Sequence, residues 1–173
     1  MITVRPESPS DYKAIYEINE RAFKRSDEAL LIENLRESDY FIPELSFVAE
    51  KNKQVIGHIV FSLVDVRNDK GAVSQILSLA PMAVSPDFQK QGVGFLLVKQ
   101  GLKKCRESGF KAVVVVGHPE YYPRFGFTSA RAKGLTLPFD APDEAFLVAE
   151  LLPGALEDIS GAIVYPPAFD DVT

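Results

Sequence analysis

The stretch Ser85–Gly94, SPDFQKQGVG, joins an apolar run that ends in PMAV to a helix-forming segment that reads FLLVKQGLKKC. Glycine costs a helix interior about 1 kcal/mol relative to alanine, so two glycines at a helix start require an explanation. The first turn of a helix carries unpartnered backbone N–H groups and a partial positive charge, which suit a phosphate or pyrophosphate. Gly92 and Gly94 would let such a group approach the backbone closely. A tight turn with close helix–sheet packing through Gly94 explains the spacing equally well.

The residues around the two glycines narrow the kind of anion. Gln89 and Gln91 can add side-chain donors and Lys90 a positive charge. The stretch lacks the GxxxxGK of a Walker loop. In GVGFLL a leucine, Leu97, stands where a dinucleotide-binding fingerprint has its third glycine, so a Rossmann-type site fits poorly.

Composition limits the class of protein. The chain has 173 residues, 46% hydrophobic and 25% charged, which is typical of one globular domain. A net charge of −5 argues against a nucleic-acid partner, since phosphate binding favours a basic face. The N-terminal MITVRPESPSD shows no signal-peptide pattern, and no apolar run reaches the roughly 20 residues of a membrane span. Cys105 is the only cysteine, so an internal disulfide is impossible. Together with the lack of a signal-peptide pattern and of an apolar span, this predicts a cytoplasmic protein without membrane contact.

The patterning along the chain predicts a mixed order of strands and helices in one α+β (mixed α/β) domain. Ser8 and Asp11 form a partial capping box before a helix whose apolar face includes Ile15, Ile18 and Phe23. The other predicted elements are, in order, a first strand over Ile2–Val4, a second helix over Asp27–Glu37, a hairpin around Lys51–Gln54, a strand over Val73–Val84, a helix over Gly92–Ser108, and strands over Ala112–Val116, Phe146–Leu151 and Ala162–Tyr165.

Two motifs, one helix and one strand apart, carry a family resemblance. Gln89–Gly94 fits Gln-x-x-Gly-x-Gly after the PMAV strand, and Tyr122–Phe127 fits Tyr-x-x-x-Gly-Phe after AVVVVGHPE. Together they resemble the GNAT superfamily of N-acetyltransferases, in which the first motif cradles the pyrophosphate of coenzyme A. GHPEYYPRFGF and the C-terminal stretch look more narrowly like a bacterial branch whose acceptors are mostly undefined.

The resemblance implies a fold and a donor. The fold would be a single domain over residues 1–173, with a central, mostly antiparallel twisted sheet flanked by helices and coenzyme A bound at a splayed strand pair. Acetyl-CoA would be the co-substrate, with no metal. The residues implied in coenzyme binding are Met82, Ala83 and Val84 for the pantetheine arm, Gln89, Lys90, Gln91, Gly92, Val93 and Gly94 for the pyrophosphate, and Arg124 for a phosphate, although Arg124 could equally pair with a surface carboxylate.

The resemblance also implies that Tyr122 protonates the departing sulfur as general acid, against the alternative that it only packs in an aromatic-rich segment. A base is harder to assign. Glu28 and Glu33 lie in the second predicted helix, and His58 lies in a half-buried strand where a structural role is more typical. Family members commonly have asparagine where this chain has His118-Pro119, so a coenzyme contact by His118 stays open. Cys105 fits a buried small hydrophobe better than an acyl carrier.

The leading functional hypothesis is an acetyl-CoA-dependent N-acetyltransferase acting on a primary amine of a small molecule or peptide. The alternative is a non-catalytic acyl-CoA-binding sensor or interaction module. We expect acceptor specificity to reside in the early helices and in the Pro/Gly-rich segment after Phe127. The sequence leaves the acceptor, the base and a homodimeric state open.

Overall fold

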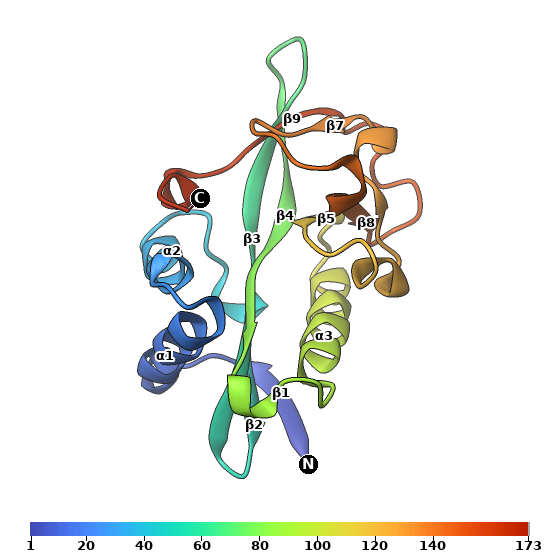
Figure 1. The fold of residues 1–173 in the computed structure, drawn as a ribbon. Helices are drawn as coiled ribbons and strands as arrows, with labels where there is room; N and C mark the ends of the chain where they lie inside the picture. The colour runs from blue at the N-terminus through green and yellow to red at the C-terminus, as the bar shows by residue number, and fades with distance from the viewer. Residues whose placement is uncertain (173) are drawn as a thin grey trace.

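The computed structural model describes residues 1–172, which form one nine-stranded sheet with helices on both sides (Figure 1). Helices α1 and α2 lie on one side of the central strands and α3 on the other. The helices are α1 (Tyr12–Phe23), α2 (Asp27–Arg36) and α3 (Val93–Glu107). The strands are β1 (Ile2–Pro6), β2 (Ser46–Lys51), β3 (Gln54–Arg67), β4 (Val73–Val84), β5 (Ala112–Val116), β6 (Thr128–Ser129), β7 (Leu135–Thr136), β8 (Phe146–Glu150) and β9 (Gly161–Val164).

The sheet is mostly antiparallel, as predicted. Its main path runs β1-β2-β3-β4-β5-β8-β6, and β9 joins β7 to the upper part of β3. Only β4 with β5 and β7 with β9 run parallel in the described chain. The hairpin predicted around Lys51–Gln54 is the β2–β3 connection, in which Lys51 is paired with Gln54.

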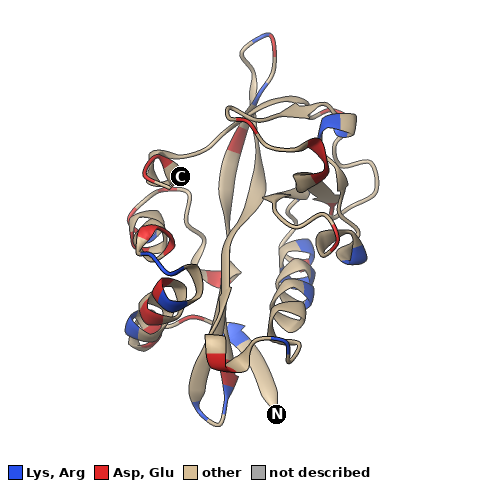
Figure 2. Ribbon diagram, viewed as in Figure 1, with Lys and Arg blue, Asp and Glu red and all other residues tan. Residues whose placement is uncertain are grey.

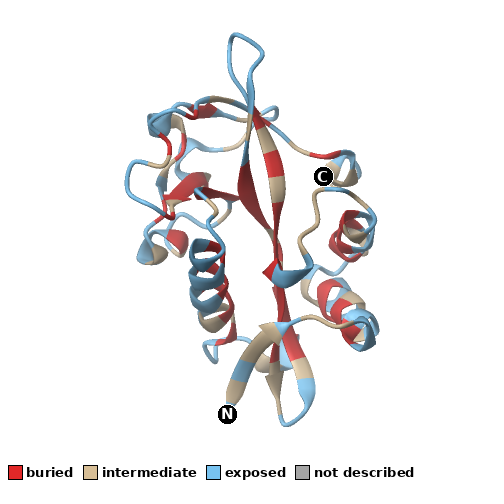
Figure 3. Cartoon of the chain, turned by 180° about the vertical axis from the view of Figure 1, so that it is seen from behind, coloured by how far each residue is buried: buried red, intermediate tan, exposed pale blue. Residues whose placement is uncertain are grey.

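Successive side chains of β2 and β3 point to opposite faces of the sheet, and this alternation decides which helices pack against which face. Phe47 and Phe61 are buried in the cluster that contains Leu97 of α3. Val48 and Val60 belong to the cluster packed by α1 and α2. Figure 3 shows the result: the central strands are buried along most of their length, and the β3–β4 tip is exposed.

The first helix forms where its capping signal predicts. The carboxylate of Asp11 accepts the Ser8 N–H at 2.8 Å, and a 3₁₀ turn over Pro9–Asp11 leads into α1. Ile15 and Ile18 are buried, but Phe23 at the end of α1 is 38% exposed. The prediction placed Phe23 on the apolar face of this helix. The chain leaves α1 there, and Phe23 faces a cavity described below.

Strands β4 and β5 pair over a short distance and then separate. Their register contains only Leu77 with Val113 and Ser78 with Val114. On its other edge β4 stays paired with β3, with a bulge opposite Val60 where Ala80 and Pro81 interrupt the register. Proline has no N–H to donate to a strand ladder, which is consistent with its position at a bulge. The edge of β4 beyond Ser78 therefore lies open toward β5, as the expected splayed pair requires.

The region after Phe127 holds two short strands that the sequence patterning did not predict. β6 and β7 are two residues each, too short to show a period of alternation. The chain ends beside α2, where Phe169 and Val172 contact the cluster of Leu31, Ile32 and Leu35. Within residues 1–172, no helix is long and apolar enough to cross a membrane. Figure 2 shows Lys and Arg along α3 and few charges on the central strands.

Candidate coenzyme and acceptor site

The open edge of β4 presents backbone groups to the gap between β4 and β5. In an antiparallel pair, residues alternate between facing the partner strand and facing away. Ser85 donates its N–H to Ile56 at 2.8 Å, which fixes this alternation at the end of β4. Val84 and Met82 then direct their N–H and C=O groups toward the gap, and Ala83 directs its own toward His58 of β3. Of the three residues expected to offer backbone to a pantetheine arm, two are therefore placed to do so.

The loop before α3 holds a row of unpartnered backbone amides. Within residues 1–172, the N–H groups of residues 91 to 95 donate no hydrogen bond, and the first bond of α3 runs from Leu96 N–H to Gly92 C=O at 3.1 Å. The amides of this turn sit at the positive end of a helix of 15 residues. This is the arrangement of groups that a phosphate or pyrophosphate satisfies.

The two glycines of the loop are required for different physical reasons. Gly92 has φ +84°, in the left-handed region, and a Cβ there would meet no atom within 4 Å. Its requirement is therefore conformational, and the space above it is open to a ligand. A Cβ on Gly94 would come within 3.2 Å of the Tyr121 hydroxyl and 3.6 Å of the Met82 methyl carbon. Gly94 thus serves close packing against the residues that border the open edge of β4.

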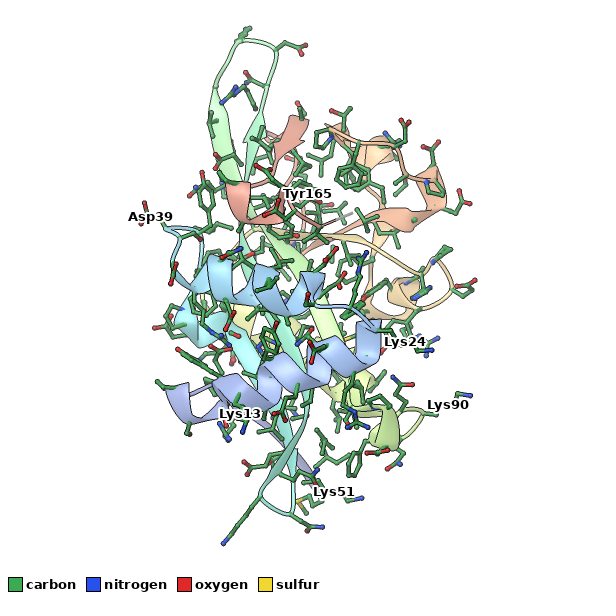
Figure 4. All side chains as sticks on the ribbon, turned by 60° about the vertical axis from the view of Figure 1, so that its left-hand side comes forward. Lys13, Lys24, Asp39, Lys51, Lys90 and Tyr165 are labelled. Atoms are coloured by element: carbon green, nitrogen blue, oxygen red, sulfur yellow. The ribbon has the colours of Figure 1, made fainter. Side chains whose placement is uncertain are left out.

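The polar side chains of the loop adopt distinct roles. Gln89 donates from Nε2 to the carbonyl oxygen of Val84 at 3.3 Å, which ties the loop to the end of β4. Lys90, with φ +64°, extends away from the body of the protein (Figure 4). Gln91 is exposed. The three residues predicted around the pyrophosphate thus surround the open amides, with Lys90 the one cation among them.

A cavity of about 760 Å³ begins at the splay and extends toward the C-terminal segment. Segments far apart in the sequence line it: the end of α1 and the start of α2, the bulge of β4, the end of β5, and the chain around Phe139 and Tyr165. Met82 borders both the cavity and the loop glycine Gly94. The loop amides and the cavity therefore lie at the two ends of one path along β4.

Tyr122 stands at the wall of the cavity on a 3₁₀ turn over Tyr122–Phe125. A Cβ on Gly117 would come within 2.6 Å of the Tyr122 ring, and the ring meets those of Tyr121 and Phe127 edge-on at 5.2 Å and 5.5 Å. Although Tyr122 is only 6% exposed, its hydroxyl has no protein partner in residues 1–172 and is not sealed from solvent. The packing holds the ring and leaves the hydroxyl free for a ligand.

Burial determines the protonation state of this phenol. Desolvation raises the pKa of Tyr122 to about 12, with a smaller contribution from Tyr121. The phenol is therefore protonated throughout the neutral range, so its hydroxyl has a proton to donate. A thiol has a pKa near ~8.5, so the cost of complete proton transfer rises from about 2 kcal/mol for an ordinary phenol to about 5 kcal/mol. Hydrogen-bond donation to a developing thiolate is the easier role.

Two residues near Tyr122 have contacts that the sequence did not predict. The guanidinium of Arg124 donates to the carbonyl oxygen of Tyr121 at 2.8 Å and to that of Glu120 at 3.3 Å. It pairs with no carboxylate in the described chain, and these two bonds use Nε and Nη2, so the Nη1 donors have no carbonyl partner among the described residues. His118 is exposed at the cavity wall, and its carbonyl oxygen accepts the Tyr122 N–H at 3.3 Å.

The three base candidates separate clearly in space. Glu28 lines the cavity, is 6% exposed and accepts two hydrogen bonds from Arg25, at 3.0 Å and 2.5 Å. Glu33 is exposed on the same helix and does not line the cavity. His58 is fully buried, with Nε2 at 2.8 Å from Ser46 Oγ and 3.0 Å from Glu7 Oε1. His58 is thus a structural residue, and Glu28 is the candidate that the fold brings to the cavity.

Sequence reasoning missed part of the cavity wall. The early helices and the segment after Phe127 contribute Phe23, Leu31 and Phe139, as their proposed role in specificity requires. Tyr165 and Asp170 also line the cavity, and the sequence did not indicate either as a site residue. No local pattern marks them, because their place depends on β9 pairing with β3 and carrying the chain back over α2.

Comparison with known proteins identifies the class. The family model of the Acetyltransferase (GNAT) family matches residues 12–127, from the start of α1 to the end of the Tyr-x-x-x-Gly-Phe motif. The chain belongs to this family, and it is an acyltransferase of the GNAT type. The splayed β4 and β5 and the mostly antiparallel sheet are the fold that the resemblance predicted.

Individual relatives span the chain. The uncharacterized N-acetyltransferase YhbS of Escherichia coli is 36% identical over 168 residues, covering 96% of this chain and 98% of YhbS. YjhQ of the same organism, also an uncharacterized N-acetyltransferase, is 38% identical over 136 residues, covering 78% of this chain and 75% of YjhQ. The crystal structure of YhbS in complex with CoA superposes with a TM-score of 0.90, at 34% identity and with 99% and 93% of the two chains covered. The crystal structure of a GNAT family acetyltransferase from Brucella melitensis in complex with acetyl-CoA superposes with a TM-score of 0.78, at 29% identity. The superposition covers 98% of this chain and 99% of the Brucella chain.

Proposed function

We propose that this protein transfers the acetyl group of acetyl-CoA to a primary amine of a small molecule or peptide. The observation that carries the proposal is the continuous path from the unpartnered amides of residues 91–95, along the open edge of β4, to the cavity at Tyr122. An extended ligand with an anionic end and a reactive end fits this path. Relatives with solved structures bind CoA and acetyl-CoA, which supports the same donor here.

The donor would lie with its pyrophosphate on the loop and its thioester at the splay. The amides from Gln91 to Phe95 would hold the pyrophosphate, with Lys90 supplying charge. The open N–H groups of Val84 and Met82 would bind the pantetheine arm in the manner of an added strand. An N–H of this edge would also donate to the thioester oxygen, where negative charge develops as the carbonyl is attacked.

The reaction requires one bond to form and one to break. The amine nitrogen attacks the thioester carbonyl carbon, the C–N bond forms, and the C–S bond breaks as the thiolate leaves. The attacking nitrogen gives up its second proton as the amide forms, and the thiolate takes up one proton, so the products are the amide and the free thiol. An amine with a pKa near ~10.4 must first lose a proton, at a cost of roughly 5 kcal/mol at pH 7. The titratable residues of the cavity wall that can receive it, directly or through water, are Glu28, His118 and Asp170. The Tyr122 hydroxyl would donate a hydrogen bond to the departing sulfur and so stabilise the developing thiolate.

The proposal is tested by calorimetric titration with acetyl-CoA, with NAD as the control ligand. We expect micromolar binding of acetyl-CoA, no binding of NAD, and loss of acetyl-CoA binding in Gly92→Glu, which places a carboxylate among the open amides. Gly109→Glu is the matched control: Gly109 follows the other end of α3, has φ +87°, and its Cβ would also meet nothing within 4 Å. Both variants carry a similar backbone cost of about 1–2 kcal/mol. Equal binding by both variants, or no binding by the parent protein at millimolar ligand, would overturn the proposed donor site.

Turnover separates an enzyme from a binding module. Amine-dependent release of free thiol from acetyl-CoA is expected for a transferase. Tight binding of acetyl-CoA without thiol release across a broad panel of amines would instead support the sensor or interaction module.

A further inference from the structure

The far half of the cavity, beyond the splay, has an apolar wall that faces solvent. Among residues 1–172, ten large hydrophobic side chains are exposed, and four of them line this one cavity: Phe23, Val116, Phe139 and Val164. Exposed apolar residues scattered singly need no explanation, but a group of them in one hollow marks a binding surface for an apolar group.

Aromatic rings form one side of this wall. The Phe139 and Tyr165 rings are 5.9 Å apart between centroids, and Tyr165 and Phe169 are 5.0 Å apart. Tyr165 and Phe169 belong to the C-terminal segment, which meets Phe139 only in the fold, and all three rings border the cavity. Burial raises the pKa of Tyr165 to about 12, an effect that the nearby Ser78 hydroxyl partly offsets, so this ring stays uncharged at neutral pH. The wall offers flat apolar faces at the spacing over which aromatic groups pack.

The charges of the wall are negative. Of the described residues that line the cavity, none is Lys or Arg, and two are carboxylates, Glu28 and Asp170. Glu28 is largely neutralised by the Arg25 guanidinium that donates to both of its oxygens. Asp170 is exposed and has no side-chain hydrogen bond or ion pair in the described structure. The wall therefore favours a cationic group near Asp170 and disfavours an acceptor that carries a carboxylate of its own.

From these observations we propose that the acceptor is an apolar monoamine: a primary amine carried on an aromatic or similarly sized hydrophobic group, without a carboxylate. The inference rests on the proposed function and specifies its substrate class. The ring of the acceptor would lie against Phe139, Tyr165 and Phe169, and its ammonium would enter past Asp170 before losing its proton near the splay. Amino acids and polar polyamines are the classes that this wall disfavours.

The test compares three amines in the thiol-release assay. 2-Phenylethylamine is the probe, phenylalanine adds a carboxylate to the same skeleton, and 1,4-diaminobutane keeps the amine and lacks the ring. We expect kcat/KM for 2-phenylethylamine to exceed that of each of the others at least about tenfold, the size of discrimination that an apolar pocket provides. Equal or better use of phenylalanine or 1,4-diaminobutane overturns the inference.

Two variants tie the preference to the wall. Phe139→Ala is expected to raise KM for 2-phenylethylamine about tenfold with unchanged affinity for acetyl-CoA, and Leu152→Ala, at a residue of matched exposure outside the cavity, is expected to change neither. Asp170→Asn is expected to narrow the preference for 2-phenylethylamine over phenylalanine several-fold. An unchanged KM in Phe139→Ala would contradict the assignment of the ring site.

The outcomes distinguish the inference from the function on which it rests. If acetyl-CoA binds but 2-phenylethylamine is not turned over, or a polar or peptide amine is preferred, the substrate class is wrong and the donor assignment stands. If acetyl-CoA does not bind in calorimetry, the proposed function itself is wrong.

Discussion

Tyr122 shows how the surroundings of a single residue suit it to the role proposed for it. The ring packs on Gly117, Tyr121 and Phe127, and among the described residues the hydroxyl has no hydrogen-bond partner; Tyr122 lines the cavity. A residue that served packing alone would have no need of a free hydroxyl at a cavity wall. The motif identified this tyrosine from the sequence, but its pKa of about 12 depends on burial and could not be predicted from the motif.

Replacing Tyr122 with phenylalanine should lower kcat for amine-dependent thiol release by about 10²-fold, because a positioned proton donor contributes at least that much. KM for acetyl-CoA should change little, since the ring and its packing remain. Tyr121→Phe is the control, because it removes a phenol hydroxyl from the neighbouring ring, which does not line the cavity, and leaves the ring contacts in place. A Tyr122→Phe enzyme with unchanged kcat would remove the hydroxyl from the mechanism.

Cys105 illustrates the opposite case, a potentially reactive group that the fold keeps inert. It is a residue of α3 on the helix face that packs into the core, where it is fully buried, and burial raises the pKa of its thiol to about 12. Since the thiolate is the reactive form, the native protein should show no reaction with a disulfide reagent over minutes at pH 7.5, and one thiol per chain should react in denaturant. Rapid labelling of the native protein would mean that α3 opens readily. The inert thiol also leaves the thiol-release assay without background from the protein.

Helix α3 connects the loop with the open amides of residues 91–95 to the core, and its glycines mark where the helix approaches the sheet. A Cβ on Gly101 would collide with the Phe61 ring of β3, with the Cζ atom at 2.8 Å. Gly101 therefore allows α3 to lie close to the sheet, which places the loop amides beside the end of β4. The sequence predicted α3 from its periodicity but gave no indication of this contact, because Phe61 is distant in the chain.

Gly101→Ala should lower the free energy of unfolding by about 1–2 kcal/mol, since a methyl group so close to the Phe61 ring should cost about 2–3 kcal/mol, the upper part of the overpacking range, and alanine returns about 1 kcal/mol of helix propensity. Urea denaturation at fixed pH measures the change. Adding Phe61→Leu should recover part of the loss, because the smaller side chain makes room for the methyl group. A Gly101→Ala protein as stable as the parent would show that α3 moves away from the sheet at little cost.

At the scale of the whole molecule, one buried polar cluster joins the start of the chain to the sheet. Glu7 follows β1 and contacts Ser46 of β2, His58 of β3 and Arg36 of α2, at distances from 2.5 Å to 3.3 Å. Burial by itself would raise the pKa of Glu7, but hydrogen bonds from His58, Arg36 and Ser46 outweigh it and lower the pKa to about 2. Burial lowers the pKa of His58, so its ring is neutral and donates from Nε2.

This cluster should make stability fall as the pH falls. The folded-state pKa of Glu7 lies below the unfolded value of 4.5, so its contribution is present above pH 4.5 and is lost toward pH 2. The contribution is about 3 kcal/mol at neutral pH, and more than half of it should be gone by pH 3. His58 acts in the same direction below pH 6.5, because it protonates more readily in the unfolded chain. Urea denaturation between pH 7 and pH 3 measures the slope.

Glu7→Gln is the matched control for the pH experiment. It should be less stable than the parent at pH 7, and its stability should fall less steeply between pH 5 and pH 3. An identical pH slope in the two proteins would assign the acid sensitivity to other carboxylates.

The sequence by itself determined the helices, the long strands and the position of the loop before α3. Each of these depends on local signals, namely helix caps, periodicity, and two motifs at fixed distances from a strand. The tertiary structure alone decided what the site can accept. β4 separates from β5 and leaves Met82 and Val84 on an open edge, and the cavity wall includes Phe23, Phe139 and Tyr165. Both features arise where distant segments meet. No spacing along the chain encodes such meetings, since they depend on strand order and on how closely the helices approach the sheet.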